Sequence, residues 1–317
     1  MNFPVFDLHC DTIYELLGKD YRAGDILRSN SRHIDLDRAK TLPGYAQCFA
    51  CFTTPMEDLP GQLTVADIFE RELSVLLREL NANADCIRQA YTAADVADNY
   101  NNGIMSAIFS IEGPAGFGYD PALLENLYQI GFRISTLGWN EKNVLTGSHV
   151  TGGGLTDLGR EYVIEAQRLG MIVDVSHISD EGFWDIMNIT EAPVIATHSN
   201  SRKICDVSRN LTDDMFRAIC ATGGVAGINL WINFLGENPC LDSVCDHIMH
   251  FMEMDPEGKH IALGGDLDGC DRLPAGFAGV QDYPKLAQRL IDRGVDANTV
   301  QNIFWNNALG VIGRCCI

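Results

Sequence analysis

Short, nearly continuous apolar segments alternate with amphipathic helical segments along this chain of 317 residues. Apolar runs of this kind are typical of parallel strands whose two faces are both covered. We expect strands at residues 4–10, 47–52, 104–111, 131–137, 171–176, 193–197, 223–230 and 260–265. This alternation favours a (β/α)8 TIM barrel, and residues 1–317 suit a single domain of that type. The alternative is an open doubly wound sheet, which is disfavoured because no Gly-x-Gly-x-x-Gly motif follows the first strand.

The segments between the expected strands carry the end signals of helices. Thr64 followed by Asp67 resembles a capping box, and Thr156 precedes an acidic first turn. Gly170 suits the left-handed position that often follows a helix. We expect helices at residues 64–82, 121–129, 157–169, 180–187, 211–221, 241–254, 282–294 and 297–308.

Composition limits the cellular environment and the classes of binding partner that we expect for this chain. The formal charge of −20 argues against nucleic acid, because phosphate binding requires clustered Lys and Arg. We see no signal segment and no apolar run near the roughly 20 residues that span a bilayer, so we expect a cytoplasmic protein without a membrane partner. The eleven cysteines then indicate reduced thiols. Cys48 and Cys51 form a C-x-x-C inside an expected strand, which favours buried thiols over a metal site.

Metal-ligand residues stand where the apolar strands end. His9 and Asp11 end the first strand, and they share one face because alternate side chains in a strand point the same way. Glu112, His177 and His198 end three later strands. The carboxyl ends of barrel strands meet at one mouth, so these side chains are expected to converge. Three imidazoles with carboxylates suit two zinc-like ions held side by side, which indicates a metal-dependent hydrolase.

The environment of each ligand is also open to prediction. Glu112 ends a buried strand, where an acid is costly unless it is paired or bound to metal, and its two oxygens could bridge two cations. The alternative is an ion pair with Arg133. Asp174, Ser176 and Ser199 are candidates to orient the two later histidines.

Two acids follow the last expected strand, in the segment GGDLDG. A carboxylate near an activated water can take its proton and return it to a leaving amine. We assign this role to Asp266, which is nearer the strand, with Asp268 as its substitute.

Six short motifs occur in one order along the chain, the first starting at residue 7 and the last ending at residue 269. They read DLHCDT, SIEG, GLTDLGREYV, RLGMIVDVSH, PVIATHSNSRKICDVSRNLTDD and LGGDLDG. In these motifs the chain resembles the membrane (renal-type) dipeptidases, the M19 peptidases of the amidohydrolase superfamily. The resemblance implies a barrel with two zinc ions, a substrate-binding Arg209 and a proton-transfer role for Asp266. The metal ligands that it implies are His9, Asp11 and Glu112 for one ion and Glu112, His177 and His198 for the other.

One position departs from that family. Members of the mammalian type carry a substrate-binding histidine just after the fourth strand, where this chain has Trp139. An indole has one donor and cannot act as an imidazole does on a carbonyl or an oxyanion. His149 or Asn140 in the same segment could substitute. We therefore count Trp139 and Asp268 with Arg209 among the expected substrate-binding residues.

The leading hypothesis is hydrolysis of a dipeptide, with the dipeptide as small-molecule partner and a homodimer allowed. Arg209 would bind the free carboxylate, since an arginine fork matches a carboxylate. One alternative is an amidohydrolase that acts on another small amide, a lactam or an N-acyl amino acid, or a deaminase. A bridging Glu112 disfavours the deaminase, which would more often hold a single metal. The other alternative is an inactive metal-binding protein, which the retained ligands and Asp266 disfavour.

Overall fold

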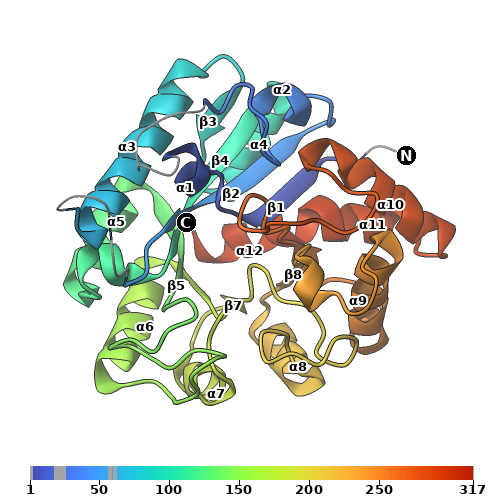
Figure 1. Cartoon of the computed structure of the whole chain (residues 1–317). Helices are drawn as coiled ribbons and strands as arrows, with labels where there is room; N and C mark the ends of the chain where they lie inside the picture. Colours follow the sequence, from blue (N-terminus) through green and yellow to red (C-terminus); the bar gives the residue numbers. More distant parts are fainter. Residues whose placement is uncertain (1–2, 18–25, 56–58, 60–62, 317) are drawn as a thin grey trace.

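A ring of parallel strands forms the centre of the protein. The computed structural model describes residues 3–17, 26–55, 59 and 63–316. The strands are β1 (Val5–Cys10), β2 (Tyr45–Phe52), β3 (Ile87–Gln89), β4 (Met105–Glu112), β5 (Phe132–Thr136), β6 (Ile172–Asp174), β7 (Val194–Ile195), β8 (Ala226–Ile228) and β9 (Ile261–Leu263). Their order is β7-β6-β5-β4-β2-β1-β9-β8, and a parallel bridge between Ala196 and Ala226 joins the two ends of this order. The predicted (β/α)8 barrel is confirmed (Figure 1).

Each of the eight predicted strands is present, and the structure adds a ninth that the sequence did not reveal. The additional strand β3 pairs with the first half of β4, from Ile87 opposite Met105 to Gln89 opposite Ala107. The neighbouring strand β5 pairs with the second half of β4, starting with Phe132 opposite Phe109. This strand reads Ile-Arg-Gln, so it lacks the apolar run by which the other strands were predicted.

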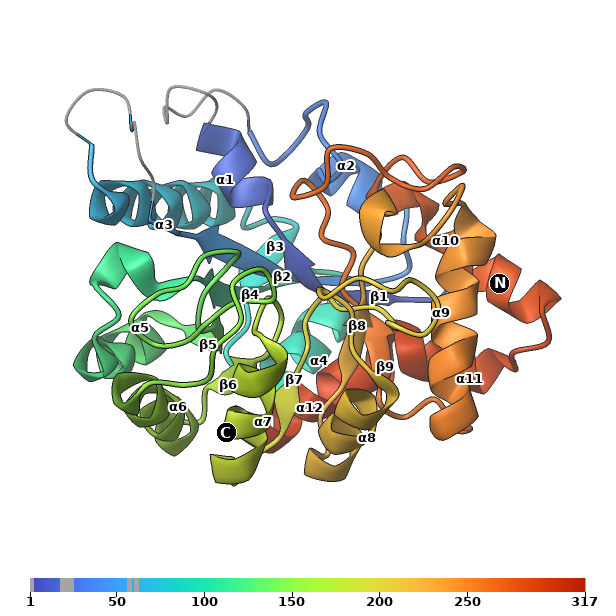
Figure 2. The ribbon, with the colours of Figure 1, turned by 60° about the horizontal axis from the view of Figure 1, so that its bottom comes forward.

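Helices pack against the strands, and those between residues 124 and 292 follow one another around the outside in chain order (Figure 1). They are α1 (Thr12–Leu17), α2 (Leu36–Ala39), α3 (Val65–Ala82), α4 (Ala93–Asn101), α5 (Leu124–Ile130), α6 (Asp157–Leu169), α7 (Asp180–Ile189), α8 (Asp213–Thr222), α9 (Leu241–Met254), α10 (Tyr283–Asp292), α11 (Ala297–Gln301) and α12 (Asn307–Cys315). Figure 2 shows α5, α6 and α7 side by side on the outer face. Among the described residues, no helix is long and apolar enough to cross a bilayer.

The predicted helix starts and stops are largely correct. Thr64 and Asp67 form the expected capping box at α3, and Thr156 caps α6 by accepting a hydrogen bond from the amide of Gly159. Helices α1, α2 and α4 were not predicted. The helix predicted at 297–308 is present and continues to Cys315, with a π-helical turn at Asn302–Asn306 between α11 and α12.

Two buried clusters form the core, one inside the barrel and one between the strands and the helices. The inner cluster includes Phe6, Leu8, Cys48, Ile108, Ile134, Ile172, Ile195 and residues of α12. Trp305, in the π-helical turn, packs on Phe6 with ring centroids 5.7 Å apart. Cys48 lies in the inner cluster and Cys51 in the outer one, and all eleven cysteines are free thiols. The C-x-x-C motif is therefore a pair of buried core thiols, as predicted.

Candidate metal centre

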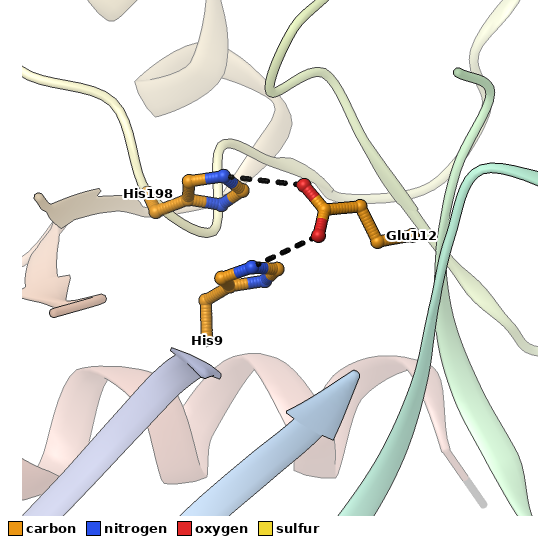
Figure 3. A group of neighbouring side chains, drawn as sticks. All are labelled: His9, Glu112 and His198. Carbon is orange, nitrogen blue, oxygen red and sulfur yellow. Dashed lines mark ion pairs between the residues drawn. The ribbon is translucent and has the colours of Figure 1, made fainter. Parts of the chain in front are cut away.

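Side chains from several strand ends meet at one mouth of the barrel. His9 lies in β1, Glu112 ends β4, and His198 follows β7 (Figure 3). Potential ligand atoms of these three residues lie within 4.8 Å of one another. The same limit holds for a second group, which consists of His9, Asp11 and Asp266. The convergence predicted from the strand ends is thus present in the fold.

A bulge in β1 determines where His9 points. Asp7 pairs with Gln47 of β2 while Cys10 pairs with Phe49, so β1 uses three residue steps where β2 uses two. The additional residue lets Leu8 and His9 lie on the same side of the strand, toward the inside of the barrel. Asp7 accepts a hydrogen bond of 3.0 Å from the His9 amide and another of 3.0 Å from the Gly265 amide. One buried carboxylate therefore holds the ends of β1 and β9 together.

Glu112 directs its two carboxylate oxygens toward different histidines. Its Oε2 lies 3.3 Å from His9 Nε2, whereas its Oε1 lies 3.0 Å from His177 Nε2 and 3.6 Å from His198 Nε2. Arg133 does not pair with Glu112, since its guanidinium donates to the carbonyl oxygens of Tyr91, Tyr128 and Phe132. The ion-pair alternative is therefore wrong, and Glu112 stands between two sets of potential ligands.

The donor atoms of this centre fit divalent cations. His9 Nε2 and Asp11 Oδ1 are buried and have no hydrogen-bond partner within the described parts of the chain. Buried polar atoms without partners are rare, and a bound ion is one common explanation for them. Imidazole nitrogens and carboxylate oxygens are the ligands that zinc prefers in catalytic sites. The residues present can thus hold metal without rearrangement of the barrel.

The charges of the centre also call for a cation. Burial, together with the nearby Glu112 carboxylate, raises the pKa of Asp11 to about 6. Burial raises the pKa of Asp266 to about 7. Burial opposes protonation of His9, but Glu112 and Asp11 raise the pKa of its imidazole well above the ordinary value. The carboxylates of the centre thus favour a proton on His9, and bound cations would supply positive charge in its place.

The His198 ring is oriented by a chain of hydrogen bonds behind it. Its Nδ1 lies 2.7 Å from Thr197 Oγ1, and this hydroxyl donates over 2.5 Å to Asp174 Oδ2. Because the only hydroxyl proton goes to the carboxylate, Thr197 accepts from Nδ1–H, and the lone pair of His198 stays on Nε2. Burial lowers the pKa of His198 well below its ordinary value, so the ring is neutral. Asp174 was predicted to have this orienting function, and Ser176 lies 3.3 Å from the same hydroxyl.

The His177 ring is oriented by Asn140, in the segment after β5. The Asn140 amide oxygen lies 3.0 Å from His177 Nδ1 and 2.8 Å from His149 Nε2. An amide oxygen only accepts, so both imidazoles donate to it and His177 Nε2 keeps its lone pair. His177 has a φ of 69° and Asp266 one of 54°, in the left-handed region that non-glycine residues seldom adopt. Such conformations cluster where a structure holds functional groups in place.

Arg209, in the loop between β7 and α8, is buried beside the centre. Its Nη1 donates to Ser199 Oγ over 2.5 Å, while its Nε and Nη2 have no hydrogen-bond partner among the described residues. Burial lowers the pKa of Arg209 to about 10, so the guanidinium remains charged at neutral pH. Ser199, which was predicted to orient a histidine, contacts the arginine instead. The free N–H groups can bind an anion such as a carboxylate.

The two acids after β9 have different surroundings. Asp266 accepts a hydrogen bond of 3.0 Å from the Asn229 side chain through Oδ2, and its Oδ1 lies 3.9 Å from His9 Nε2. Asp268 accepts from Thr12 Oγ1 over 2.7 Å and from the His33 amide over 2.6 Å. One oxygen of Asp266 thus faces the centre, whereas both oxygens of Asp268 are engaged in tying the loops together.

A cavity of about 510 Å³ opens over the centre. Its walls include the ligand candidates Asp11, Glu112 and His177 as well as Asp266 and Asp268. The remaining lining residues are Tyr14, Glu15, Phe52, Trp139, Asn140, His149, Val207, Trp231, Asn233, Phe234 and Gly269. A space of this size suits a small-molecule ligand, and apolar walls with a few polar groups are typical of such sites.

Comparison with known proteins identifies the family. The model of the membrane dipeptidase family, peptidase family M19, matches residues 1–315. The chain belongs to this family.

Two of its sequence relatives differ in how much of their length it matches. It is 36% identical over 214 residues to an uncharacterised dipeptidase of Schizosaccharomyces pombe, and the aligned region covers 65% of this chain and 52% of the relative. It is 32% identical over 260 residues to an uncharacterised protein of the pqqA 5′ region of Klebsiella pneumoniae, which covers 78% of this chain and 95% of that protein. The chain therefore matches about half of the yeast relative and nearly all of the bacterial one.

A solved structure shares the whole fold with this M19 family member. It is a metallopeptidase from Rhodobacter sphaeroides liganded with a phosphinate mimic of the dipeptide L-Ala-D-Ala. The two chains superpose with a TM-score of 0.89 at 27% identity, over 99% of this chain and 100% of the other. The amidohydrolase-type barrel expected from the sequence is thus shared with a metallopeptidase.

Three residues of the dipeptidase-family centre were missed in the sequence. Asn229 directly follows the apolar strand β8, which is the same signal that marked Glu112. Thr197 precedes His198, and its function depends on a hydroxyl that also reaches Asp174. Asp7 lies within the DLHCDT motif, but its partners His9 and Gly265 are brought together only by the pairing of β1 with β9.

Proposed function

We propose that this chain is a two-zinc dipeptidase that hydrolyses dipeptides with a free carboxyl-terminal carboxylate. The proposal rests on the two carboxylate oxygens of Glu112, which point to different histidines. Oε2 faces His9, whereas Oε1 faces His177 and His198. A carboxylate in this position can bridge two cations. One zinc ion would be held by His9, Asp11 and Glu112, and the other by Glu112, His177 and His198.

The chemistry divides between the bound ions and the side chains around them. Two zinc ions, if bound at this centre, would supply Lewis acidity for the scissile carbonyl and would lower the pKa of a water for attack near neutral pH. Asp266, held through Oδ2 by Asn229, presents Oδ1 to the centre and accepts the proton of the attacking water. It then delivers this proton to the departing amine. The raised pKa that burial gives Asp266 favours both transfers.

Arg209 positions the substrate by its carboxylate. Its Nε and Nη2 donors are buried and unengaged within the described chain, so an entering carboxylate would complete their hydrogen bonding. The third guanidinium nitrogen, Nη1, already donates to Ser199. A fixed distance between this guanidinium and the scissile bond would restrict cleavage to short substrates. The dipeptide mimic bound by the Rhodobacter sphaeroides metallopeptidase supports a dipeptide as substrate.

Metal analysis and a substrate panel test the proposal. Purified protein that has been incubated with zinc and freed of excess ion should retain close to two zinc ions per chain. It should hydrolyse members of a panel of L,L and L,D dipeptides. A zinc content near zero would reject the binuclear centre, and metal-loaded protein that cleaves no dipeptide would reject the activity.

The function of Arg209 needs a separate comparison. Replacement by alanine should weaken transition-state binding of a free dipeptide by about 1.5–3 kcal/mol, the range for hydrogen bonds to charged groups. The carboxyl-terminal amide of the same dipeptide should lose much less. Equal losses in kcat/KM for the acid and the amide would reject carboxylate binding by Arg209.

A further inference from the structure

Two groups of aromatic side chains line the cavity over the centre. In the first group, Tyr14 contacts Phe52 edge-on with ring centroids 5.2 Å apart, and Phe52 contacts Trp139 edge-on at 5.3 Å. Trp139 continues this wall to His177, with centroids 6.2 Å apart. We name the group Tyr14, Phe52 and Trp139 the first aromatic wall. Interlocked rings of this kind form a stiff apolar surface.

The second group stands beside the arginine. Trp231 and Phe234 meet edge-on with centroids 4.6 Å apart, and the Trp231 indole donates to Asp271 over 2.9 Å. The guanidinium carbon of Arg209 lies 5.7 Å from the centre of the Phe234 ring. We name Trp231 and Phe234 the second aromatic wall. It belongs to the end of the cavity that would receive the substrate carboxylate.

The strand order places Phe52 of the first wall across the ring from the loop that carries Arg209. Phe52 is the last residue of β2, which pairs in register with Glu112 of β4. In the order β7-β6-β5-β4-β2-β1-β9-β8, β2 stands four places from β7, which is the far side of a ring of eight. The loop after β7 carries Arg209, and the segment after β8 carries the second wall. A substrate anchored at Arg209 and cleaved beside Glu112 therefore extends its amino-terminal residue toward β2.

From this arrangement we infer that the first aromatic wall binds the side chain of the amino-terminal residue and selects dipeptides with a large apolar residue there. The inference rests on the proposed dipeptidase function and adds the class of substrate to it. Trp139 suits this wall because its indole offers a large apolar face between Phe52 and His177. An alanine side chain would leave the wall in contact with water, whereas a phenylalanine side chain would cover it.

A crossed comparison of variants and substrates tests the inference. The substrates are Phe-Ala, Ala-Phe and Ala-Ala, with the carboxyl-terminal stereochemistry that the wild type prefers. For the zinc-loaded wild type, kcat/KM for Phe-Ala should exceed that for Ala-Ala by about 10–100-fold, the range for added apolar groups in a fitted pocket. Phe52→Ala should reduce this ratio by about tenfold. The matched variant Trp231→Ala, on the second wall, should leave the same ratio within about threefold of the wild type and change the ratio of Ala-Phe to Ala-Ala instead.

Each result decides between the proposals. If the wild type cleaves Phe-Ala and Ala-Ala at rates within about threefold, the inference is overturned while the dipeptidase function stands. If Trp231→Ala removes the amino-terminal preference and Phe52→Ala keeps it, the walls are assigned the wrong way round and the inference falls. If Phe52→Ala does not fold, Trp139→Leu replaces it with the same expectation. If the wild type cleaves none of the three dipeptides or the L,L and L,D panel, the proposed function itself is overturned.

Discussion

Removal of one hydroxyl behind the candidate metal centre should selectively weaken the binding of one of the two proposed zinc ions. Thr197→Val keeps the β-branched shape of the side chain but deletes the hydroxyl that lies 2.7 Å from His198 Nδ1. Without this acceptor, the imidazole proton can move to Nε2, the nitrogen that faces Glu112 Oε1 at 3.6 Å. A protonated Nε2 has no lone pair for a metal. The ion between Glu112, His177 and His198 should therefore be the one that is lost.

The magnitude follows from what the hydroxyl contacts. Removal of a group that orients a metal-binding histidine typically lowers metal affinity by about 10–100-fold, or about 1.4–2.7 kcal/mol. The variant also leaves His198 Nδ1–H without an acceptor and Asp174 Oδ2 without the donor at 2.5 Å. Each buried group left without a partner costs roughly 1–3 kcal/mol of folding free energy. The metal-free variant should thus be less stable than the metal-free wild type.

Competition against a chromophoric chelator measures the zinc affinities. The wild type should show two ions, and Thr197→Val should show one ion of nearly unchanged affinity and one that is weakened. Thr299→Val is the matched control, because Thr299 also donates to a carboxylate over 2.5 Å, that of Asp296, but lies in α11. Equal affinities of both ions in Thr197→Val and wild type would refute the reasoning. A similar weakening in Thr299→Val would assign the effect to general loss of stability.

Further predictions concern the proton carrier, a glycine and a buried acid. Asp266→Asn should lower kcat by about 10²–10⁴-fold, the usual contribution of acid–base catalysis, with zinc content unchanged by metal analysis; an unchanged rate would move the proton transfer elsewhere. Gly269→Ala should abolish binding of at least one zinc ion, because its Cβ would lie 2.1 Å from Asp11 Oδ2 and 2.3 Å from Asp266 Oδ1; a full complement of zinc in this variant would contradict the geometry. Burial and the nearby Asp11 carboxylate raise the pKa of Glu72 well above 4.5, so the folded state binds this proton more tightly than the unfolded state does. The stability that Glu72 contributes is present below pH 4.5 and is lost as the pH rises through its folded-state pKa. Glu72→Gln should therefore be more stable than wild type in urea unfolding at pH 8, with a smaller difference at pH 5. A difference in stability that does not grow with pH would reject the raised pKa of Glu72.

Much of the fold was predictable because the determining signals are local. Apolar strands and helix caps such as the Thr64–Asp67 box lie within a few neighbouring residues. The convergence of His9, Glu112 and His198 was also predictable, although they are far apart in the chain. The carboxyl ends of parallel barrel strands must meet at one mouth, so a polar residue at each strand end reveals its place without knowledge of the contacts.

The remaining features of the site depend on contacts between distant segments. The bulge in β1 that turns His9 inward follows from the register with β2, and no residue type within β1 predicts it. Asn140 orients His177 across 37 residues, and Asn229 holds Asp266 across the same separation. The residue types that reach the mouth of the barrel can be read from the chain, since they follow from strand polarity. The pairing of each Glu112 oxygen with its histidine, and the wall that each aromatic ring joins, become known only in the folded protein, because they depend on how side chains from separate strands pack together.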